Sequence, residues 1–178
     1  TNSGVLNLSI SADFPALINV VSTNTINGAG DLTVNSDFTI QGSINGPGIL
    51  IINANSTWPS GVLNRALTVG SLRTLTIPTA GFKSLYKNLT NNGTINWQDG
   101  VINYFNTPTL TNNGLWTITS NSPTSYGDSY GTIINQGTIT KTSAGITDFS
   151  FVTTFNNLTG ATINFNGGEL RAGSTTFN

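Results

Sequence analysis

The residues of this chain that could do acid–base chemistry are seven carboxylates, because the sequence contains no histidine and no cysteine. Ser–His and Cys–His nucleophilic machinery and the usual zinc sites need those two residue types, so the sequence excludes them. Enzymes that cleave polysaccharides instead hold acidic side chains close together on one face. The candidates for such a cluster are Asp13, Asp31, Asp37, Asp99, Asp128, Asp148 and Glu169.

These carboxylates have no common phase against the glycines that recur along the chain. Asp99 comes soon after Gly93, Glu169 and Asp148 come later after Gly160 and Gly137, and Asp128 comes latest after Gly114. Side chains at different phases of a repeat do not stack, so the sequence predicts no catalytic residues and no enzyme. Asp99 and Glu169 are expected to be solvated turn residues. No metal site and no cofactor are predicted, because no EF-hand or nonapeptide calcium loop is present; calcium in the turns stays open.

One irregular segment, SPTSYGDSYG at 122–131, has a composition suited to binding. It places Tyr126, Asp128 and Tyr130 among small polar residues, and tyrosine in such surroundings makes good contacts with a sugar or a peptide. These three residues are the candidate ligand site, and a plain surface bulge is the structural alternative. Further stacking surface could come from Trp58, Tyr86, Trp97, Tyr104 and Trp116, although Trp97 and Trp116 would equally suit a core.

Threonine also recurs in a pattern that could bind a ligand. Thr-x-Thr occurs at 74–76, 117–119 and 138–140, with Thr94 and Thr162 at matching places. A flat, regular threonine face is what ice-binding solenoids present. The array is interrupted by Asn96 and Asn164, with Arg73 and Lys141 beside it in the sequence, and outward threonine is also a favoured strand residue. Ice binding is therefore the third hypothesis.

The elements that position all these residues are indicated by a recurring glycine, whose period of about 22 residues is typical of repeat architectures. The series is Gly4, Gly28, Gly48, Gly70, Gly93, Gly114, Gly137 and Gly160. Each glycine precedes a stretch in which apolar and polar residues alternate, which is typical of a strand with one buried face. The side chains expected inside are Leu6, Leu8, Leu32, Val34, Leu50, Ile52, Leu75, Ile77, Ile95, Trp97, Ile118, Ile139, Ile163 and Phe165.

A repeat of about 22 residues with several short strands is best explained by one coil of a parallel β-solenoid, with coils about 4.8 Å apart. We therefore predict an all-β fold, a right-handed parallel β-solenoid (β-helix) of about eight coils of 20–24 residues, as a single domain over residues 1–178. A propeller, a leucine-rich repeat and an immunoglobulin-like sandwich fit this period less well. Residues 1–23, with Pro15, are expected to form an N-terminal cap or a first coil.

Asparagine accompanies the recurring glycine, shortly before it, at Asn27, Asn45, Asn91, Asn112, Asn135 and Asn157. A corner between strands needs a sharp turn, where glycine permits a positive φ and asparagine bonds to nearby backbone. Stacked coils would bring these amides into a ladder in which each side chain pairs with the next. We expect this structural asparagine ladder to be the main reason for the repeat.

The segments LTNNGTINWQDGVINYFNTPTLTNNGLWTITSN (89–121) and INQGTITKTSAGITDFSFVTTFNNLTGATINF (134–165) carry the pattern best. In them the chain resembles the β-helices of filamentous-haemagglutinin-type proteins and autotransporter passengers. The resemblance implies a bacterial, secreted or surface-exposed stalk or adhesin segment of a larger protein. It covers most of the chain, more loosely before residue 88.

The composition agrees with an extracellular protein. Charged residues make up only 7% of the chain and the net charge is −1, against about 25% charged residues in an average globular domain. The scattered Lys and Arg form no basic face for nucleic acid, and no apolar run is long enough for a membrane span. We expect a non-catalytic structural or adhesive segment that self-associates through its ends or binds a glycan or other cell-surface ligand. A carbohydrate-binding or carbohydrate-active β-helix is the alternative.

Overall fold

The structure is a computed structural model that describes residues 5–8, 12–14, 18–20, 24–122 and 129–172. These residues form strands and turns, without a helix. The strands in the first half are β1 (Val5–Leu8), β2 (Ala12–Phe14), β3 (Ile18–Val20), β4 (Thr25–Gly28), β5 (Leu32–Val34), β6 (Phe38–Ile40), β7 (Ser43–Ile52), β8 (Ser56–Thr57), β9 (Gly61–Val69), β10 (Thr74–Ile77) and β11 (Lys83–Leu85). Those in the second half are β12 (Leu89–Asn91), β13 (Thr94–Trp97), β14 (Ile102–Tyr104), β15 (Thr109–Asn112), β16 (Leu115–Ile118), β17 (Gly131–Asn135), β18 (Thr138–Lys141), β19 (Ile146–Phe149), β20 (Val152–Asn157), β21 (Thr162–Phe165) and β22 (Glu169–Ala172).

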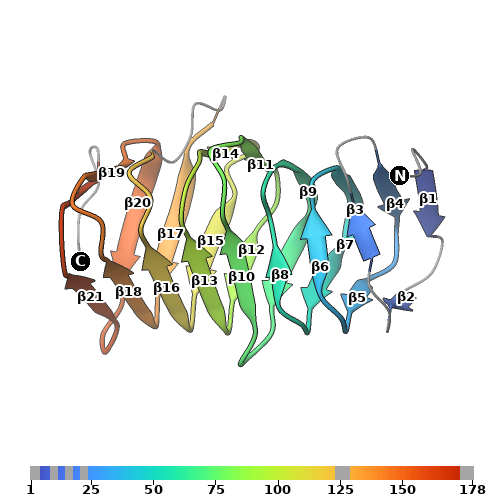
Figure 1. Cartoon of the computed structure of the whole chain (residues 1–178), viewed down its shortest axis with the longest axis horizontal. Helices are drawn as coiled ribbons and strands as arrows, with labels where there is room; N and C mark the ends of the chain where they lie inside the picture. Colours follow the sequence, from blue (N-terminus) through green and yellow to red (C-terminus); the bar gives the residue numbers. More distant parts are fainter. Residues whose placement is uncertain (1–4, 9–11, 15–17, 21–23, 123–128, 173–178) are drawn as a thin grey trace.

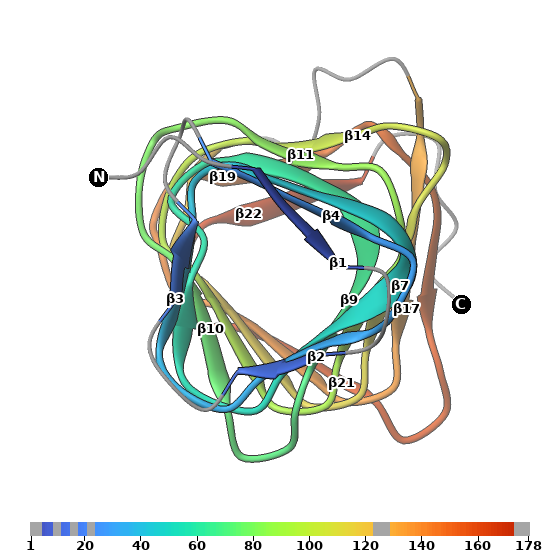
Figure 2. The ribbon, with the colours of Figure 1, turned by 90° about the vertical axis from the view of Figure 1, so that its right-hand side faces the viewer.

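The strands wind into a rod, with β1 at one end and β21 at the other (Figure 1). Each coil contributes up to three strand segments, and each segment pairs in parallel with the corresponding segment of the next coil. Face 1 contains β1, β4, the first halves of β7 and β9, β11 and β14, with β19 and β22 on the same side (Figure 2). Face 2 contains β2, β5, the second halves of β7 and β9, β12, β15, β17 and β20. Face 3 is the sheet β21-β18-β16-β13-β10-β8-β6-β3.

This architecture confirms the predicted all-β parallel solenoid. Face 3 has eight strands in succession, which corresponds to about seven turns from first to last. The number of residues per coil varies more than the glycine spacing indicates. Fewer residues separate Thr25 from its partner Ser43 in the next coil than separate Thr138 from its partner Thr162. The right-handed sense of the coil stays a prediction. The described parts of residues 1–23 are β1, β2 and β3, which form the first strand of each face.

The interior of the rod is one continuous hydrophobic cluster that extends from Ile26 to Phe155. It is built from the alternate residues of every strand, because successive side chains of a strand point to opposite sides. Ten of the expected inward residues are at most 1% exposed: Leu32, Val34, Leu50, Ile52, Leu75, Ile77, Ile95, Trp97, Ile118 and Ile139. Ile163 is only partly buried. Phe165 was wrongly expected inside and is 56% exposed, because its strand, β21, is the last in the face 3 sheet.

The corner between faces 2 and 3 explains two of the recurring glycines, Gly114 and Gly137, by the close approach of neighbouring coils. A Cβ on Gly114 would collide with the carbonyl oxygen of Gly93, and a Cβ on Gly137 with the carbonyl oxygen of Gly114. These residues do not have a positive φ, so the expectation that turn conformation selects glycine there is wrong. The cause is the close approach of one coil's backbone to the next. That expectation does hold at Gly160, where φ is 86° and nothing lies within 4 Å of the added Cβ.

Candidate binding surfaces

The large aromatic residues divide between the core and the outer surface. Trp58, Trp97, Trp116 and Tyr104 are at most 1% exposed. Trp97 stacks on Trp116 with ring centroids 6.1 Å apart, and its Nε1 donates to the carbonyl of Gly100 at 2.8 Å. Burial also raises the pKa of Tyr104. These four residues are therefore core residues and offer no stacking surface to a ligand.

Two aromatic pairs lie on the outside instead, and the sequence analysis recognised only one member of each. Tyr86 stacks on Phe105 with centroids 4.4 Å apart and planes 8° apart. Tyr130 stacks on Phe151 at 6.0 Å and 25°. Tyr130 is 53% exposed. The other two members of the predicted ligand site, Tyr126 and Asp128, lie outside the described residues. Phe105 follows β14 of face 1, and Phe151 follows β19 on the same side of the rod. This similar position within the repeat is the sequence signal that could have indicated both phenylalanines as outward residues.

The described carboxylates support turns rather than converge on a site. Asp31 Oδ1 accepts the amide of Ile49 at 2.8 Å, and Asp99 Oδ1 accepts the amide of Gly100 at 2.7 Å. Glu169 pairs with Arg171 at 2.8 Å on the surface. Within the described ranges no three His, Cys, Asp or Glu side chains come together as metal ligands would.

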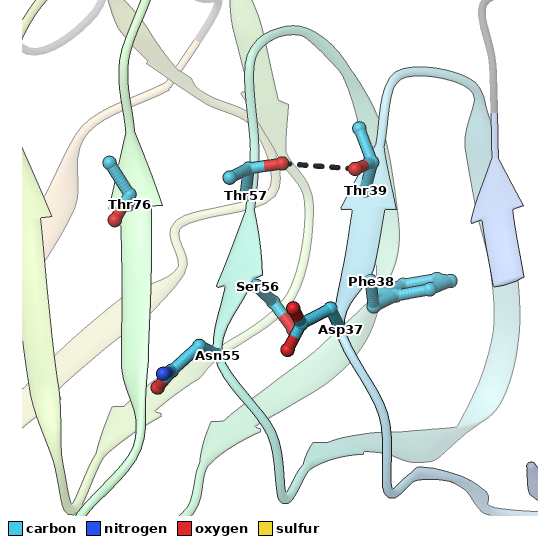
Figure 3. Close-up of a pocket in the computed structure, with 7 residues that line it drawn as sticks. All are labelled: Asp37, Phe38, Thr39, Asn55, Ser56, Thr57 and Thr76. Carbon is cyan, nitrogen blue, oxygen red and sulfur yellow. Dashed lines mark hydrogen bonds between the residues drawn. The ribbon is translucent and has the colours of Figure 1, made fainter. Parts of the chain in front are cut away.

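A shallow groove of about 280 Å³ crosses the outer side of face 3 over β6, β8 and β10. It is lined by Asp37, Phe38, Thr39, Asn55, Ser56, Thr57 and Thr76 (Figure 3). The depression forms where β8 is only two residues long and carries small side chains. Thr57 Oγ1 donates to Thr39 Oγ1 at 3.1 Å. Its lining offers hydroxyls, one amide and one carboxylate, but its single aromatic residue, Phe38, is 1% exposed.

The threonines of face 3 form two outward rows. One row continues through Thr39, Thr57, Thr76, Asn96, Thr117, Thr140 and Asn164. The neighbouring row includes Thr74, Thr94, Leu115, Thr138 and Thr162. Lys141, which follows Thr140 in the sequence, points inward and is fully buried. Seen along the rod, however, the strands of this face fan out rather than superimpose (Figure 2), so the rows follow a twisted surface.

The asparagines lie in two rows at two different corners. Asn91, Asn112, Asn135 and Asn157 form one ladder between faces 2 and 3, in which each Nδ2 pairs with the next Oδ1 at 2.7 Å. Asn27 and Asn45 pair with each other at 3.0 Å between faces 1 and 2. Their row continues to Asn64, which the sequence analysis did not single out. The prediction of a single ladder is thus replaced by two, because Asn91 stacks on Val69 and not on an asparagine.

Three cations point into the rod, and each donates to backbone carbonyls of a turn. Arg65 donates to the carbonyls of Gly28 and Asn45, and its Nε and Nη1 have no hydrogen-bond partner among the residues that the structure describes. Lys83 donates to the carbonyls of Thr79, of Gly81 at 2.6 Å and of Asp99 at 3.3 Å. Lys141 donates to both oxygens of Ser143.

The loss of water around these cations weakens their charged forms. Burial lowers the pKa of Lys83 from 10.5 to about 8, against the opposing pull of the Asp99 charge. Burial also lowers the pKa of Arg65 and of Lys141. No sequence pattern indicated these inward cations, because each one replaces an apolar side chain in an otherwise alternating strand.

Comparisons with known protein families, with curated proteins and with solved structures return no match to this chain. The parallel β-solenoid agrees with the resemblance to haemagglutinin-type and autotransporter β-helices in architecture. No match supports a family relationship. No helix in the described part of the chain is long and apolar enough to cross a membrane.

Proposed function

We propose that this chain is a non-catalytic structural and adhesive segment of a larger extracellular protein. The observation that carries the proposal is the single core cluster that joins successive coils, from Ile26 to Phe155, into one rod. Each coil contacts mainly its neighbours, so such an array serves as an extended support whose sides and turns remain available for contacts.

The use of the polar groups supports a role without catalysis. Asp31 accepts the amide of Ile49 in the next coil and Asp99 accepts the amide of Gly100, while buried Lys83 donates to the turn carbonyl of Gly81. The buried asparagines are paired with one another along the rod. These groups stabilise corners that otherwise leave backbone atoms unpaired. The secreted, cell-surface location and the bacterial origin are part of the same proposal and rest on the low charge and the architectural resemblance.

The described end of the rod supports self-association. Among the described residues β21 pairs with one strand, β18, and Phe165 on it is 56% exposed, with Leu158 at 40% nearby in the chain. Free strand edges with exposed apolar side chains pair with other chains. We therefore propose that two rods join end to end, which would extend the stack.

Light scattering over a concentration series, with electron microscopy of the same samples, tests this association. The apparent mass should rise with concentration, and end-to-end rods should be visible. Phe165→Lys should reduce the association, because a charge at the end would have to lose its water. Leu72→Lys is the matched control: Leu72 is 96% exposed on a side turn, so this variant should behave as the unchanged chain. A strict monomer at every concentration would remove self-assembly from the proposal.

Carbohydrate binding is the second candidate, favoured by the two outward aromatic pairs. Ice binding ranks third. Its support is the two threonine rows of face 3, but Asn96, Asn164 and Leu115 interrupt them and the surface is twisted.

A further inference from the structure

Asparagine followed directly by glycine is a chemically labile dipeptide, and it occurs at five places in this chain. The backbone nitrogen of the glycine can attack the side-chain carbonyl carbon of the asparagine, because glycine has no Cβ to restrict the approach. The pairs begin at Asn27, Asn45, Asn92, Asn113 and Asn166. The attack needs a free side-chain amide and a free backbone N–H, so the hydrogen bonds around each pair decide whether it reacts.

Four of the five pairs have an asparagine side chain that is held by a neighbouring coil. Asn45 Nδ2 donates to Asn27 Oδ1 at 3.0 Å. Asn113 Nδ2 donates to Asn92 Oδ1 at 2.8 Å. An amide that makes such a bond must first break it before its carbonyl carbon can turn toward the following backbone nitrogen.

The glycines of the same four pairs are restrained as well. The amide of Gly93 donates to Asn91 Oδ1 at 3.1 Å, and the amide of Gly114 donates to the carbonyl of Asn91 at 3.1 Å. Gly28 and Gly46 lie within strands β4 and β7, where pairing with neighbouring coils holds the backbone. The nitrogen that would attack is therefore not free to move in these pairs.

The pair at Asn166 lacks both restraints. Asn166 follows β21 at the end of the rod (Figure 1) and is exposed. Its backbone amide donates to the carbonyl of Lys141 at 2.8 Å, and the register places its side chain beside Thr142, which has no amide to pair with it. Within the described part of the chain, neither the Asn166 side chain nor the amide of Gly167 has a hydrogen-bond partner. Gly168, with φ 64°, makes this a turn of two consecutive glycines.

The reaction open to this pair is deamidation. The Gly167 nitrogen loses its proton and bonds to Cγ of Asn166, the Cγ–Nδ2 bond breaks, and ammonia leaves with a proton from water. A second water then opens the cyclic imide at either of its carbonyls and gives aspartate or isoaspartate. The net change is the exchange of an NH2 group for an OH group. It needs no cofactor, and the new carboxyl group is ionised at neutral pH.

We propose that Asn166 is the site at which the folded chain deamidates spontaneously, and that the new carboxylate weakens end-to-end association. Asn166 follows Phe165, the exposed ring of the end at which the rods are proposed to join. A carboxylate at this end would have to lose its water when two rods meet. Arg171, the exposed cation of the last described strand, already pairs with Glu169 at 2.8 Å. The site itself is independent of self-association, and only its consequence rests on that proposed function.

Peptide mapping by mass spectrometry, after storage of the folded chain in mildly alkaline buffer, tests the site. Enzymatic methylation of isoaspartate identifies the second product. Asn166 should lose its amide about tenfold faster than Asn113, which must first break its hydrogen bonds. In urea the Asn–Gly pairs should react at similar rates, because all have the same following residue.

Two variants separate the hydrogen bonds from the sequence. Asn92→Ala removes the partner of Asn113 and should raise the deamidation rate at Asn113. Asn166→Gln should abolish the reaction at 166, because the longer side chain disfavours ring closure. The assignment is overturned if Asn113 reacts as fast as Asn166 in the folded chain, or if Asn166 keeps its amide while the chain in urea loses it.

Light scattering over a concentration series tests the consequence separately. Asn166→Asp imitates one product and should reduce association, whereas Ser71→Asp adds the same charge at an exposed side turn and should not. Circular dichroism confirms that both variants are folded. Equal association of Asn166→Asp and the unchanged chain would overturn the consequence. A monomeric unchanged chain would instead contradict self-assembly, and the peptide map would still decide the site.

Discussion

Asn112 shows why the buried amide ladder stabilises the rod and not only its turns. It is fully buried, accepts from Asn91 Nδ2 at 2.7 Å and donates to Asn135 Oδ1 at 2.7 Å. Its Nδ2 also lies 3.1 Å from the carbonyl of Thr138. A side-chain amide has both a donor and an acceptor, so it can accept a hydrogen bond from one coil and donate one to the next. An ionised carboxylate can only accept.

We expect Asn112→Ala to lower the free energy of unfolding by about 1–3 kcal/mol, because it leaves the facing amide groups of Asn91 and Asn135 without a partner. Asn112→Asp should cost more, since a carboxylate would face Asn135 Oδ1. Urea unfolding followed by circular dichroism measures both. Asn113→Ala provides the control: this exposed neighbour pairs with exposed Asn92, at 2.8 Å, and its loss should change stability by less than about 0.5 kcal/mol. Equal losses at the two positions would contradict the role assigned to the buried ladder.

Lys83 makes the stability of the rod depend on pH. Burial lowers its pKa in the folded chain to about 8, against 10.5 for the ordinary side chain. Between these two values the unfolded chain binds a proton that the folded chain has released, so the free energy of unfolding rises as pH increases. Lys141 acts in the same direction. Tyr104 acts in the opposite direction above about pH 10, because its pKa is raised on folding.

The test is urea unfolding at several pH values between 8 and 9.5. The unchanged chain should gain stability across this range, with a slope below the one-proton limit of about 1.4 kcal/mol per pH unit for Lys83. Lys83→Met should lose that part of the slope. Lys87→Met replaces an exposed lysine and should keep the slope of the unchanged chain. If Lys83→Met keeps the full slope of the unchanged chain, Lys83 is not a source of the pH dependence.

At the scale of the elements, the corners rather than the strands limit which residues can be changed. Strand positions alternate between a core side and an outer side, and each tolerates a class of side chains. The corner between faces 2 and 3 brings Gly93, Gly114 and Gly137 so close together that a Cβ would meet the carbonyl of the previous coil. The turn at Gly160 is different, because space is free there and only its φ of 86° favours glycine.

These two mechanisms predict different costs for the same substitution. Gly160→Ala should lower the free energy of unfolding by about 1–2 kcal/mol, the cost of a left-handed conformation for a residue with a side chain. Gly114→Ala should cost more than this, because the whole corner must shift away from Gly93. Thermal and urea unfolding of the two variants give the comparison. A larger loss at Gly160 would show that backbone conformation, and not coil spacing, governs the corners.

At the scale of the whole molecule, the rod combines a continuous interior with a varied exterior. The core cluster runs through the coils from Ile26 to Phe155, whereas the outer rows change character along the rod. At the corner between faces 1 and 2, Asn27, Asn45 and Asn64 are followed in the next two coils by the stacked pair Tyr86 and Phe105. Because each coil contacts mainly its neighbours, such a change needs no adjustment elsewhere. This independence lets the outer surface vary from coil to coil while the core stays continuous.

The sequence by itself determined the class of fold. Glycine spacing and alternating residues such as Leu32 and Val34 depend only on local strand geometry and on the need of each coil to bury one side, so the solenoid and most of its core followed from them. Only the tertiary structure decided which residues share a row. Coils of unequal length shift the stacking register, so Asn91 lies over Val69 and Tyr86 over Asn64. The inward lysines and the outward aromatic pairs likewise became apparent only when the coils were stacked in space.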